Sequence, residues 1–188
     1  MDIVFLDIDG VLNNFNDYKA MVTEDNPLIK FFSKNNLFFF LDALKTIKKK
    51  RDIKIVISSS WRQETYEDFI QDLKDYAHGR DKEFASYLHK DWRTPKLSKR
   101  RGEEVMAWLA HHVGEIDKYI CLDDDSDYAA IQPLLLIDDS YGFGDRENKI
   151  MIDYFCGNAN DYDKKIKYGL NFLKRVVRNQ ELFIKCYL

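Results

Sequence analysis

The stretch MDIVFLDIDGVLNN, residues 1–14, joins a short apolar run to two acidic residues and a glycine. Residues 3–6 contain no turn former, which predicts a strand buried on both faces of a sheet. Asp7 and Asp9 follow this run, and Gly10 allows the backbone to turn away. A strand that simply ends in Asp and Gly accounts for one acid, but a second unpaired acid inside an apolar stretch is costly. Because open α/β sheets bind ligands at the carboxyl ends of their strands, both acids are predicted to lie in a functional site.

The rest of the chain alternates apolar runs with helical periodicity. Buried strands are predicted at residues 53–57, 119–122 and 134–137, with a further short strand at 149–152. Amphipathic helices are predicted at residues 37–50, 61–76, 103–112 and 161–179. Strands that alternate with helices of this length indicate the α/β class, here a three-layer, Rossmann-like domain whose central parallel sheet has helices on both faces.

The 188 residues suffice for a single domain that spans residues 1–188. Within it, residues 13–36 and 78–98 are polar and are interpreted as short irregular inserts. The first insert is predicted to contain one helical turn near residues 28–32, and the second a short helix near residues 83–88.

Composition excludes several classes of protein. Hydrophobic residues make up 45% and charged residues 32% of the chain, which is typical of neither a disordered nor a membrane protein. The net charge of −3 argues against the strong basic field of non-specific nucleic-acid binders. The sequence has no signal-peptide pattern and no membrane-spanning run, and its three cysteines lack CxxC spacing. Reduced thiols in the cytoplasm are therefore expected.

Polar residues follow two more of the predicted strands. The strand at 53–57 ends in serines, and the strand at 119–122 ends in a run of acids. Because the carboxyl ends of parallel strands meet at one edge, these groups are expected to converge on Asp7 and Asp9. Phosphoryl transfer from a monoester needs a nucleophile, an acid for the leaving alcohol, donors and a cation for the phosphate oxygens, and a divalent metal. The sequence offers each of these.

The two acids after the first strand fit two different roles. Asp7 can attack the phosphorus and form an aspartyl-phosphate. Asp9 can protonate the leaving group and then activate a water molecule. Mg²⁺ prefers hard oxygen ligands, and Asp7 together with Asp123 or Asp124 can supply them. The charge of this metal explains how so many acids tolerate one another, since like charges this close would otherwise force some of them to be protonated.

These features resemble the motifs of the haloacid dehalogenase (HAD) superfamily of phosphohydrolases. The hexapeptide DIDGVL, residues 7–12, resembles the first motif, DxDGxx. The serines after residues 53–57 resemble the second motif, a hydroxyl that binds phosphoryl oxygens; Ser59 is favoured and Ser58 is next, depending on strand register. The segment YICLDD, residues 119–124, resembles the fourth motif, an apolar strand followed by a metal-binding acidic pair.

The resemblance also implies a third-motif lysine and a set of metal ligands. Lys99, just ahead of the predicted helix at 103–112, is the preferred lysine, which would neutralise the nucleophile and the phosphate. Lys96 and Arg101 are alternatives, because this motif has little sequence signature. The implied ligands of Mg²⁺ are Asp7, the backbone carbonyl of Asp9, Asp123 and Asp124, with Asp127 as a further candidate.

A narrower resemblance is carried by four stretches in order, DIDGVLN, ISSSWR, RRGEEVMAWL and YICLDDDSD. Together they resemble the HAD-type domain of Swiss-Army-knife RNA-repair proteins. The likeness spans most of the chain and departs at residues 134–157, which are interpreted as an insertion near the site. Arg62 and Arg101 fall within these stretches and would either contact substrate or brace the acidic cluster; for a buried arginine, a structural ion pair is expected.

A second acidic pair offers an alternative metal site. Asp138 and Asp139 also follow an apolar run, at residues 134–137. The pair at Asp123 and Asp124 is preferred, because the helix at 103–112 leads the chain directly into the strand before it.

Three function classes compete with the phosphatase. A non-catalytic, receiver-like or interaction module that keeps only the Mg²⁺ pocket would need Asp7 but has no use for Asp9. A glycosyltransferase with a DxD motif would need a nucleotide-binding half, which is not evident before Asp7. Dehalogenase chemistry is disfavoured because Asp9 would be superfluous there.

The site is expected to be open, since neither residues 13–36 nor residues 78–98 could hold a large cap domain. An open site suits a phosphorylated macromolecule as partner and substrate. The resemblance implies the 3′- or 5′-phosphate end of a nucleic acid as one candidate, and phosphotyrosine or phosphoserine of a protein as the other. The absence of a basic stripe favours a protein or an isolated end over a long duplex. The sequence therefore predicts a Mg²⁺-dependent phosphatase of protein or nucleic-acid phosphoesters.

Overall fold

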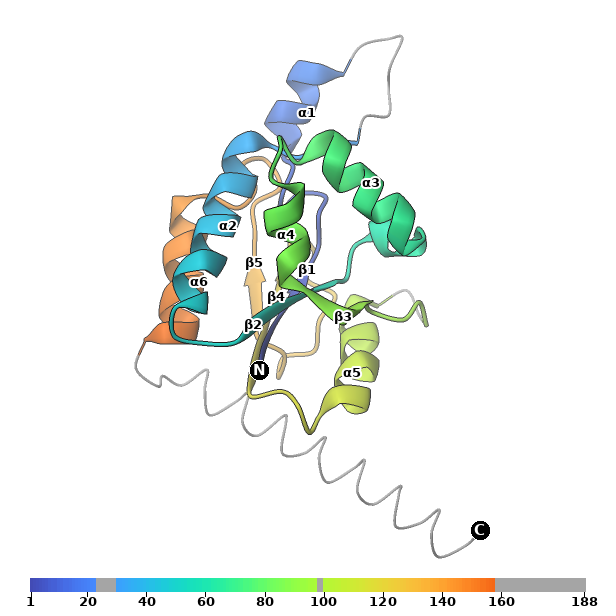
Figure 1. Ribbon diagram of the computed structural model, residues 1–188, viewed down its shortest axis with the longest axis vertical. Coiled ribbons are helices and arrows are strands. Elements are labelled where there is room, and N and C mark those ends of the chain that lie inside the picture. Colours follow the sequence, from blue (N-terminus) through green and yellow to red (C-terminus); the bar gives the residue numbers. More distant parts are fainter. Residues whose placement is uncertain (23–29, 98–99, 158–188) are drawn as a thin grey trace, which may run out of the picture.

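The computed structural model describes residues 1–22, 30–97 and 100–157, and its centre is one parallel sheet (Figure 1). The strands are β1 (Asp2–Leu6), β2 (Ile53–Ile57), β3 (Leu88–Arg93), β4 (Lys118–Asp123) and β5 (Leu134–Leu136). They pair in the order β3-β2-β1-β4-β5, with every pair parallel. Each residue of the central strand β1 is buried, as its apolar sequence predicts. The predicted Rossmann-like α/β class is thus confirmed.

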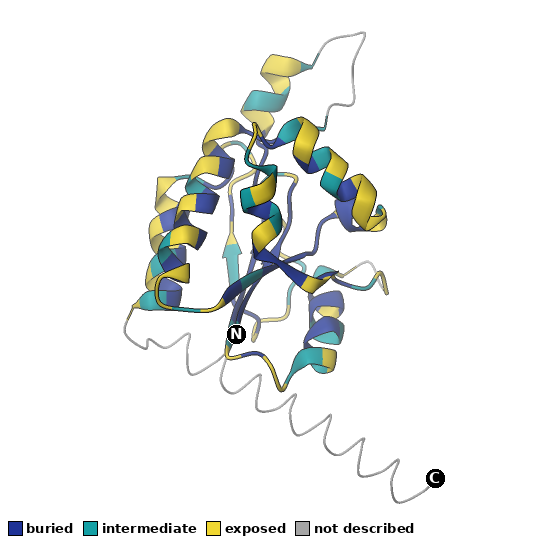
Figure 2. Ribbon diagram, viewed as in Figure 1, coloured by how far each residue is buried: buried dark blue, intermediate teal, exposed yellow. Residues whose placement is uncertain are grey.

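Helices connect the strands and cover the sheet. They are α1 (Phe15–Met21), α2 (Lys34–Lys48), the short 3-10 helix η1 (Ser60–Gln63), α3 (Tyr66–Tyr76), α4 (Asp81–Tyr87), α5 (Arg101–His112) and α6 (Asp145–Cys156). The connection from β1 through α2 to β2 and the connection from β3 through α5 to β4 run in opposite directions across the sheet. Right-handed crossovers then place α2 and α5 on opposite faces. Figure 2 shows the buried strands and the amphipathic helices around them.

Packing on the two faces follows the apolar patterns of the helices. On one face, α6 lies beside α2, and the side-chain amide of Asn148 donates to the backbone carbonyl of Phe39 at 2.9 Å (Figure 1). On the other face, Trp108 of α5 meets Phe5 of β1 edge to face, with 5.3 Å between ring centroids. Burying these large rings supplies much of the hydrophobic stabilisation of the core.

The strand β3 lies within residues 78–98, for which the sequence predicts an irregular insert. This edge strand exposes half of its residues, and its pairing with β2 shifts register between Ile55 and Ile57. A short, irregular edge strand of this kind carries neither a continuous apolar run nor a clean alternation.

The predicted strand at residues 149–152 is wrong, because these residues belong to α6. The buried residues Met151, Tyr154 and Phe155 have the i, i+3, i+4 spacing of a helix, and Glu147 contributes to the N-terminal cap by accepting from the backbone N–H of Gly144 at 3.0 Å. The segment 134–157, interpreted as an insertion, thus forms β5 and α6.

Smaller differences concern the helices. The predicted helix at 61–76 is divided, since Thr65 begins a new helix by accepting from the backbone N–H of Asp68 at 3.1 Å. Residues 15–21, predicted to be irregular, form α1. The predicted helix at 161–179 and the start of the predicted helical turn at 28–32 lie outside the described residues, and residues 30–32 are not helical.

None of the described helices combines the length and the apolar character that are needed to cross a bilayer.

Candidate functional site

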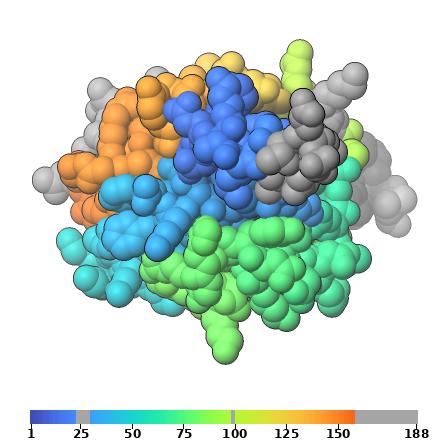
Figure 3. Space-filling model, turned by 90° about the horizontal axis from the view of Figure 1, so that it is seen from above, coloured from blue at the N-terminus to red at the C-terminus, as the bar shows by residue number. Residues whose placement is uncertain are grey.

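Three neighbouring strands end in polar residues at the same level of the sheet. Leu6 of β1 is paired with Ile57 of β2 on one side and with Leu122 of β4 on the other. The next residues along these strands are Asp7, Ser58 and Asp123, and all three are buried. Figure 3 views the molecule from this end, with α1 in blue near the centre. The structure therefore brings the predicted first, second and fourth motifs together at one edge.

Gly10 turns the chain away from this edge in a conformation that favours glycine. Its φ angle is +73°, in the left-handed region. A Cβ atom at this position would lie 2.5 Å from Cγ of Asp124. The glycine of the DxDG sequence thus allows the loop after β1 to press against the loop after β4.

An acidic cluster occupies the centre of the site. Asp7, Asp123 and Asp124 each offer a carboxylate oxygen, and these oxygens lie within 4.8 Å of one another. Oδ1 of Asp7 is buried and has no hydrogen-bond partner among the described residues. Mg²⁺ prefers hard oxygen ligands, and this cluster offers three carboxylates, one of which has an oxygen without a hydrogen-bond partner among the described residues. The role of the Asp9 backbone carbonyl as a ligand stays a prediction.

Burial and mutual repulsion make these carboxylates hard to ionise without a cation. Desolvation and the charge of Asp123 raise the pKa of Asp7 to about 8, although the nearby Arg101 lowers it. Burial and Asp123 raise the pKa of Asp124 to about 6. Burial also raises the pKa of Asp123 itself. The cluster therefore favours an added positive charge at neutral pH.

This electrostatic imbalance predicts that the metal-free protein loses stability as pH rises. Between about pH 4 and 8 the folded Asp7 keeps a proton that an unfolded aspartic acid has released, so the free energy of unfolding falls over this interval. Mg²⁺ binding to the ionised carboxylates should reverse the loss, and more strongly at pH 8 than at pH 5. The measurement is the melting temperature in EDTA and in Mg²⁺ across this range.

The variant Asp7→Asn is the control that isolates this carboxylate. In EDTA, the melting temperature of the variant minus that of the wild type should grow from pH 5 to pH 8, because the amide does not titrate. A difference that shrinks over the same interval would show that Asp7 is not the carboxyl group whose pKa is raised in the folded protein.

Arg101, at the first position of α5, is the cation that meets the acids. Its Nη2 lies 3.6 Å from Oδ1 of Asp7, and its Nε lies 3.6 Å from Oδ2 of Asp123. Its Nη1 also donates to the backbone carbonyl of Ser58. Asp7 and Asp123 contribute to a raised pKa of Arg101, which therefore stays charged despite partial burial. The geometry gives Arg101 the position predicted for the third-motif cation.

The other two candidates for the third-motif cation are Lys96 and Lys99. Lys96 is exposed, and its Nζ donates to the side-chain carbonyl of Gln63 at 2.8 Å. Its ammonium is thus engaged by a surface amide. Lys99, the preferred candidate, lies outside the described residues.

Arg62 forms the structural ion pair that was expected of it. It is bonded to Glu104 of α5, and the two side chains are 7% and 2% exposed. Its Nη1 also donates to the backbone carbonyls of Ser58 and Ser59, at 2.6 and 2.7 Å. Glu104 in turn accepts from the backbone N–H of Leu97 at 3.1 Å. This buried pair fixes the serine turn against the start of α5.

The two serines of the second motif differ in their surroundings. Ser59 caps η1, and its hydroxyl accepts from the backbone N–H of Trp61 at 3.4 Å. The hydroxyl of Ser58 is buried without a hydrogen-bond partner among the described residues, and Ser58 follows β2 at the level of Asp7. The geometry therefore favours Ser58 over Ser59, the serine that the sequence pattern favours.

Asp9 is exposed beside the acidic cluster and is held by three donors. The amide of Asn13 donates to it at 2.9 Å, the indole N–H of Trp61 at 3.2 Å, and the hydroxyl of Ser60 at 3.4 Å. The contact with Asn13 has a local signal, since the two residues are four positions apart in the turn after β1. The contact with Trp61, which is more than 50 positions away, has no local signal in the sequence.

Two residues that follow Asp123, Asp127 and Tyr128, stabilise the loop after β4. Asp127, a further metal candidate from the sequence, accepts from the backbone N–H of Arg101 at 2.8 Å and so fixes the start of α5. Tyr128 donates its hydroxyl to Oδ2 of Asp123 at 2.6 Å, which no sequence pattern indicated.

Asp138 and Asp139 are one strand farther from Asp7. They follow the edge strand β5, whereas Asp123 ends β4, the direct neighbour of β1. The backbone carbonyl of Asp138 accepts from Gly142 at 2.8 Å in a turn. The charge of Asp139 contributes to the raised pKa of Asp124. The second acidic pair thus borders the cluster but is not aligned with Asp7 across the sheet.

Comparison with protein families agrees with this geometry. The family model described as "HAD domain in Swiss Army Knife RNA repair proteins" matches residues 3–147. The matched range includes β1 from residue 3 onward, the other four strands and every acid of the site described above. No curated protein and no solved structure matches the chain.

Proposed function

Because the chain belongs to the family of HAD domains found in Swiss Army Knife RNA repair proteins, we propose that it removes phosphate from the end of a nucleic acid through an aspartyl-phosphate on Asp7. The family indicates a Mg²⁺-dependent phosphohydrolase, and HAD proteins generally use this metal. The observation that carries the proposal is the buried Oδ1 of Asp7, which has no hydrogen-bond partner among the described residues and lies 3.6 Å from the guanidinium of Arg101, itself 3.6 Å from Asp123.

The first step of the proposed reaction transfers the phosphoryl group to the protein. Oδ1 of Asp7 attacks the phosphorus while the bond from phosphorus to the leaving oxygen breaks. Asp9 gives a proton to that oxygen, so that an alcohol rather than an alkoxide departs. The guanidinium of Arg101, 3.6 Å from Asp7, and the hydroxyl of Ser58, which follows β2 at the level of Asp7, would stabilise charge on the phosphoryl oxygens.

The second step restores the nucleophile. A water molecule attacks the phosphorus of the aspartyl-phosphate, and Asp9, now a carboxylate, accepts a proton from that water. The bond between phosphorus and Asp7 breaks, which releases phosphate. Mg²⁺, when held by Asp7, Asp123 and Asp124, would offset negative charge on the phosphoryl group throughout.

Three features support a phosphate end as the substrate. Asp9 is exposed, so its proton can reach a leaving group that is attached to a large molecule. The net charge of −3 disfavours binding along a duplex, which needs many cationic contacts, but it is compatible with recognition of a terminal nucleotide. The family description, which names RNA repair, favours a nucleic-acid end over a phosphoprotein.

A direct comparison of substrates tests this proposal. Oligoribonucleotides with a 3′- or a 5′-phosphate, a phosphotyrosine peptide and a phosphoserine peptide are assayed in parallel with Mg²⁺. We expect kcat/KM for one of the oligonucleotides to exceed that of either peptide by about tenfold or more, equivalent to about 1.4 kcal/mol of transition-state binding. A preference for a peptide would overturn the substrate, while the absence of phosphate release from all four would favour the non-catalytic, Mg²⁺-binding module.

The acid role of Asp9 predicts an effect that depends on the leaving group. Asp9→Asn should lower kcat/KM for a phosphorylated oligonucleotide by about 10²- to 10³-fold, because an alkoxide leaves poorly without a proton. For p-nitrophenyl phosphate the decrease should be below about tenfold, because nitrophenolate leaves unaided and kcat/KM reports only the first step. The aryl substrate is thus the control for folding and binding. Equal losses on both substrates would contradict the acid role.

A further inference from the structure

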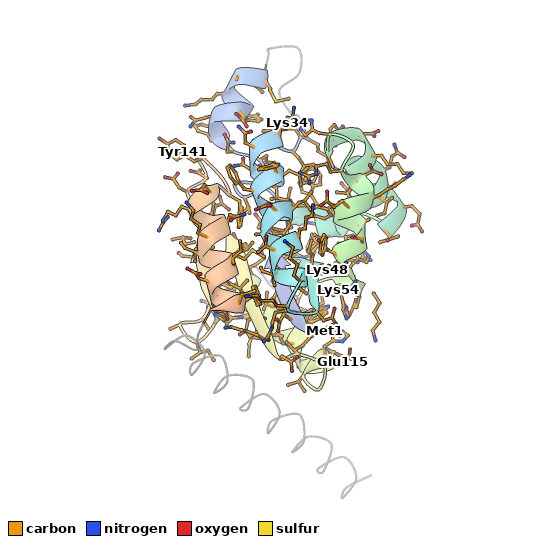
Figure 4. The ribbon with its side chains drawn as sticks, turned by 60° about the vertical axis from the view of Figure 1, so that its left-hand side comes forward. Met1, Lys34, Lys48, Lys54, Glu115 and Tyr141 are labelled. Carbon is orange, nitrogen blue, oxygen red and sulfur yellow. The ribbon has the colours of Figure 1, made fainter. Side chains whose placement is uncertain are left out.

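A second cluster of metal-ligating side chains lies far from the aspartates. His89 of β3, His112 at the end of α5 and Glu115 just beyond it each offer a ligand atom, and these atoms lie within 4.8 Å of one another. The helix α5 begins at Arg101 beside Asp7 and ends at His112, so about 17 Å of helix separates the two clusters. Figure 4 shows Glu115 near Met1, at the opposite end of the molecule from Tyr141.

His112 has one engaged and one unsatisfied ring nitrogen. Its Nε2 lies 2.9 Å from Oδ2 of Asp91. Its Nδ1 is buried without a hydrogen-bond partner among the described residues and lies 3.9 Å from Oε1 of Glu115. Two metal bonds of about 2.1 Å span up to about 4.2 Å, so an ion fits between these atoms. A ring held by a carboxylate on one nitrogen and free on the other is typical of a metal-ligating histidine.

His89 is also engaged through one ring nitrogen, Nδ1, which lies against the backbone of Asp91. The residue is 5% exposed, and its Nδ1 lies 3.2 Å from the backbone carbonyl oxygen and 3.0 Å from the backbone nitrogen of Asp91. No described residue forms a hydrogen bond with its Nε2. The rings of His89 and His112 are nearly perpendicular, with 5.1 Å between centroids, and both pack against Trp108. Both imidazoles are therefore held in place by contacts other than a metal.

We propose that His89, His112 and Glu115 bind a divalent transition metal of the zinc class, with Asp91 orienting both histidines. Two nitrogens and one carboxylate are a ligand set that Zn²⁺ accepts, with a fourth position left for water. The all-oxygen cluster of Asp7, Asp123 and Asp124 suits Mg²⁺ instead. The bound metal would join the edge strand β3 to the end of α5 and so stabilise the half of the domain that carries Arg101.

A simpler interpretation of the cluster is an ion pair between His112 and Asp91 beside stacked rings. That interpretation explains Nε2 of His112 but leaves its buried Nδ1 unsatisfied. Lys90 competes weakly for Glu115, because the two groups lie 3.8 Å apart and their side chains are 74% and 44% exposed. Glu115 is thus available as a ligand.

Cobalt titration of the full chain tests the proposal. The protein is stripped with a chelator, supplied with excess Mg²⁺ to occupy the aspartates, and titrated with Co²⁺ while visible absorption is followed. We expect one equivalent to give the intense absorption of a low-coordinate site with nitrogen ligands, and Zn²⁺ to displace it. His111→Gln is the matched control, because His111 is exposed and its one hydrogen bond within the described residues is to the carbonyl of Ala107.

The variants separate the metal site from the ion pair. His112→Gln should abolish the absorption, and Glu115→Gln should weaken Co²⁺ binding by about tenfold or more. Asp91→Asn should weaken it by about 10- to 100-fold. Glu115 and Asp91 are exposed, so these two variants keep the fold, which circular dichroism verifies. Absence of the absorption in the wild type, or binding that is unchanged in Glu115→Gln and Asp91→Asn, would overturn the proposal.

Discussion

Asp7→Asn is expected to lower kcat for phosphate release by about 10⁴-fold or more, because the proposed nucleophile is lost. The amide nitrogen and oxygen are poor nucleophiles, and the change also removes a metal ligand. The fold should survive, since the neutral amide avoids the desolvation and the repulsion by Asp123 that raise the pKa of Asp7 to about 8. The measurement is steady-state hydrolysis of p-nitrophenyl phosphate in Mg²⁺.

Asp153→Asn is the matched control for this result. Asp153 is an exposed carboxylate on α6, outside the acidic cluster, so the same chemical change there should leave kcat within about twofold of the wild type. Activity of Asp7→Asn within tenfold of the wild type would exclude Asp7 as the nucleophile.

Arg101→Ala should produce the second largest loss, about 10³-fold in kcat/KM. The guanidinium lies 3.6 Å from both Asp7 and Asp123, where it offsets the charge of the nucleophile and of the incoming phosphate. Arg101→Lys should recover part of the activity, because it keeps the charge but loses the planar fork of donors. Both variants are measured with p-nitrophenyl phosphate and with a phosphorylated oligonucleotide.

Two lysine variants make this prediction specific. Lys96→Ala should retain nearly full activity, since the ammonium of Lys96 bonds to Gln63 on the surface. Lys99→Ala tests the residue that the sequence favoured for the same role. A larger loss in Lys99→Ala than in Arg101→Ala would show that the third-motif cation is Lys99.

The fold was predictable where apolar runs are continuous. Residues 3–6 and 119–122 lie in β1 and β4 at the middle of the sheet, where burial on both faces requires apolar side chains throughout. The strand β3 escaped prediction because an edge strand faces solvent on one side and here also shifts register. The misassigned strand at 149–152 shows the related limit that a short apolar run can fit either a strand or a helix.

The acids of the site were predictable because each follows a buried strand, and parallel strands bring their ends together. The choice between Ser58 and Ser59 was not, because it depends on a register that differs by one residue. The position of Arg101 depends on where α5 begins, and this is fixed by Asp127, a contact across 26 positions. Long-range contacts of this kind leave no local pattern in the sequence.

The proposed aspartyl-phosphate can be tested by trapping it. Asp9→Asn should still form the intermediate from p-nitrophenyl phosphate but hydrolyse it slowly, because the base that activates water is missing. The variant is mixed with substrate and Mg²⁺, quenched in acid and digested, and its peptides are analysed by mass spectrometry. We expect one phosphoryl group on Asp7, absent when Asp7→Asn is added. Nitrophenolate release with no phosphoryl group on the protein, or with the group on another residue, would contradict it.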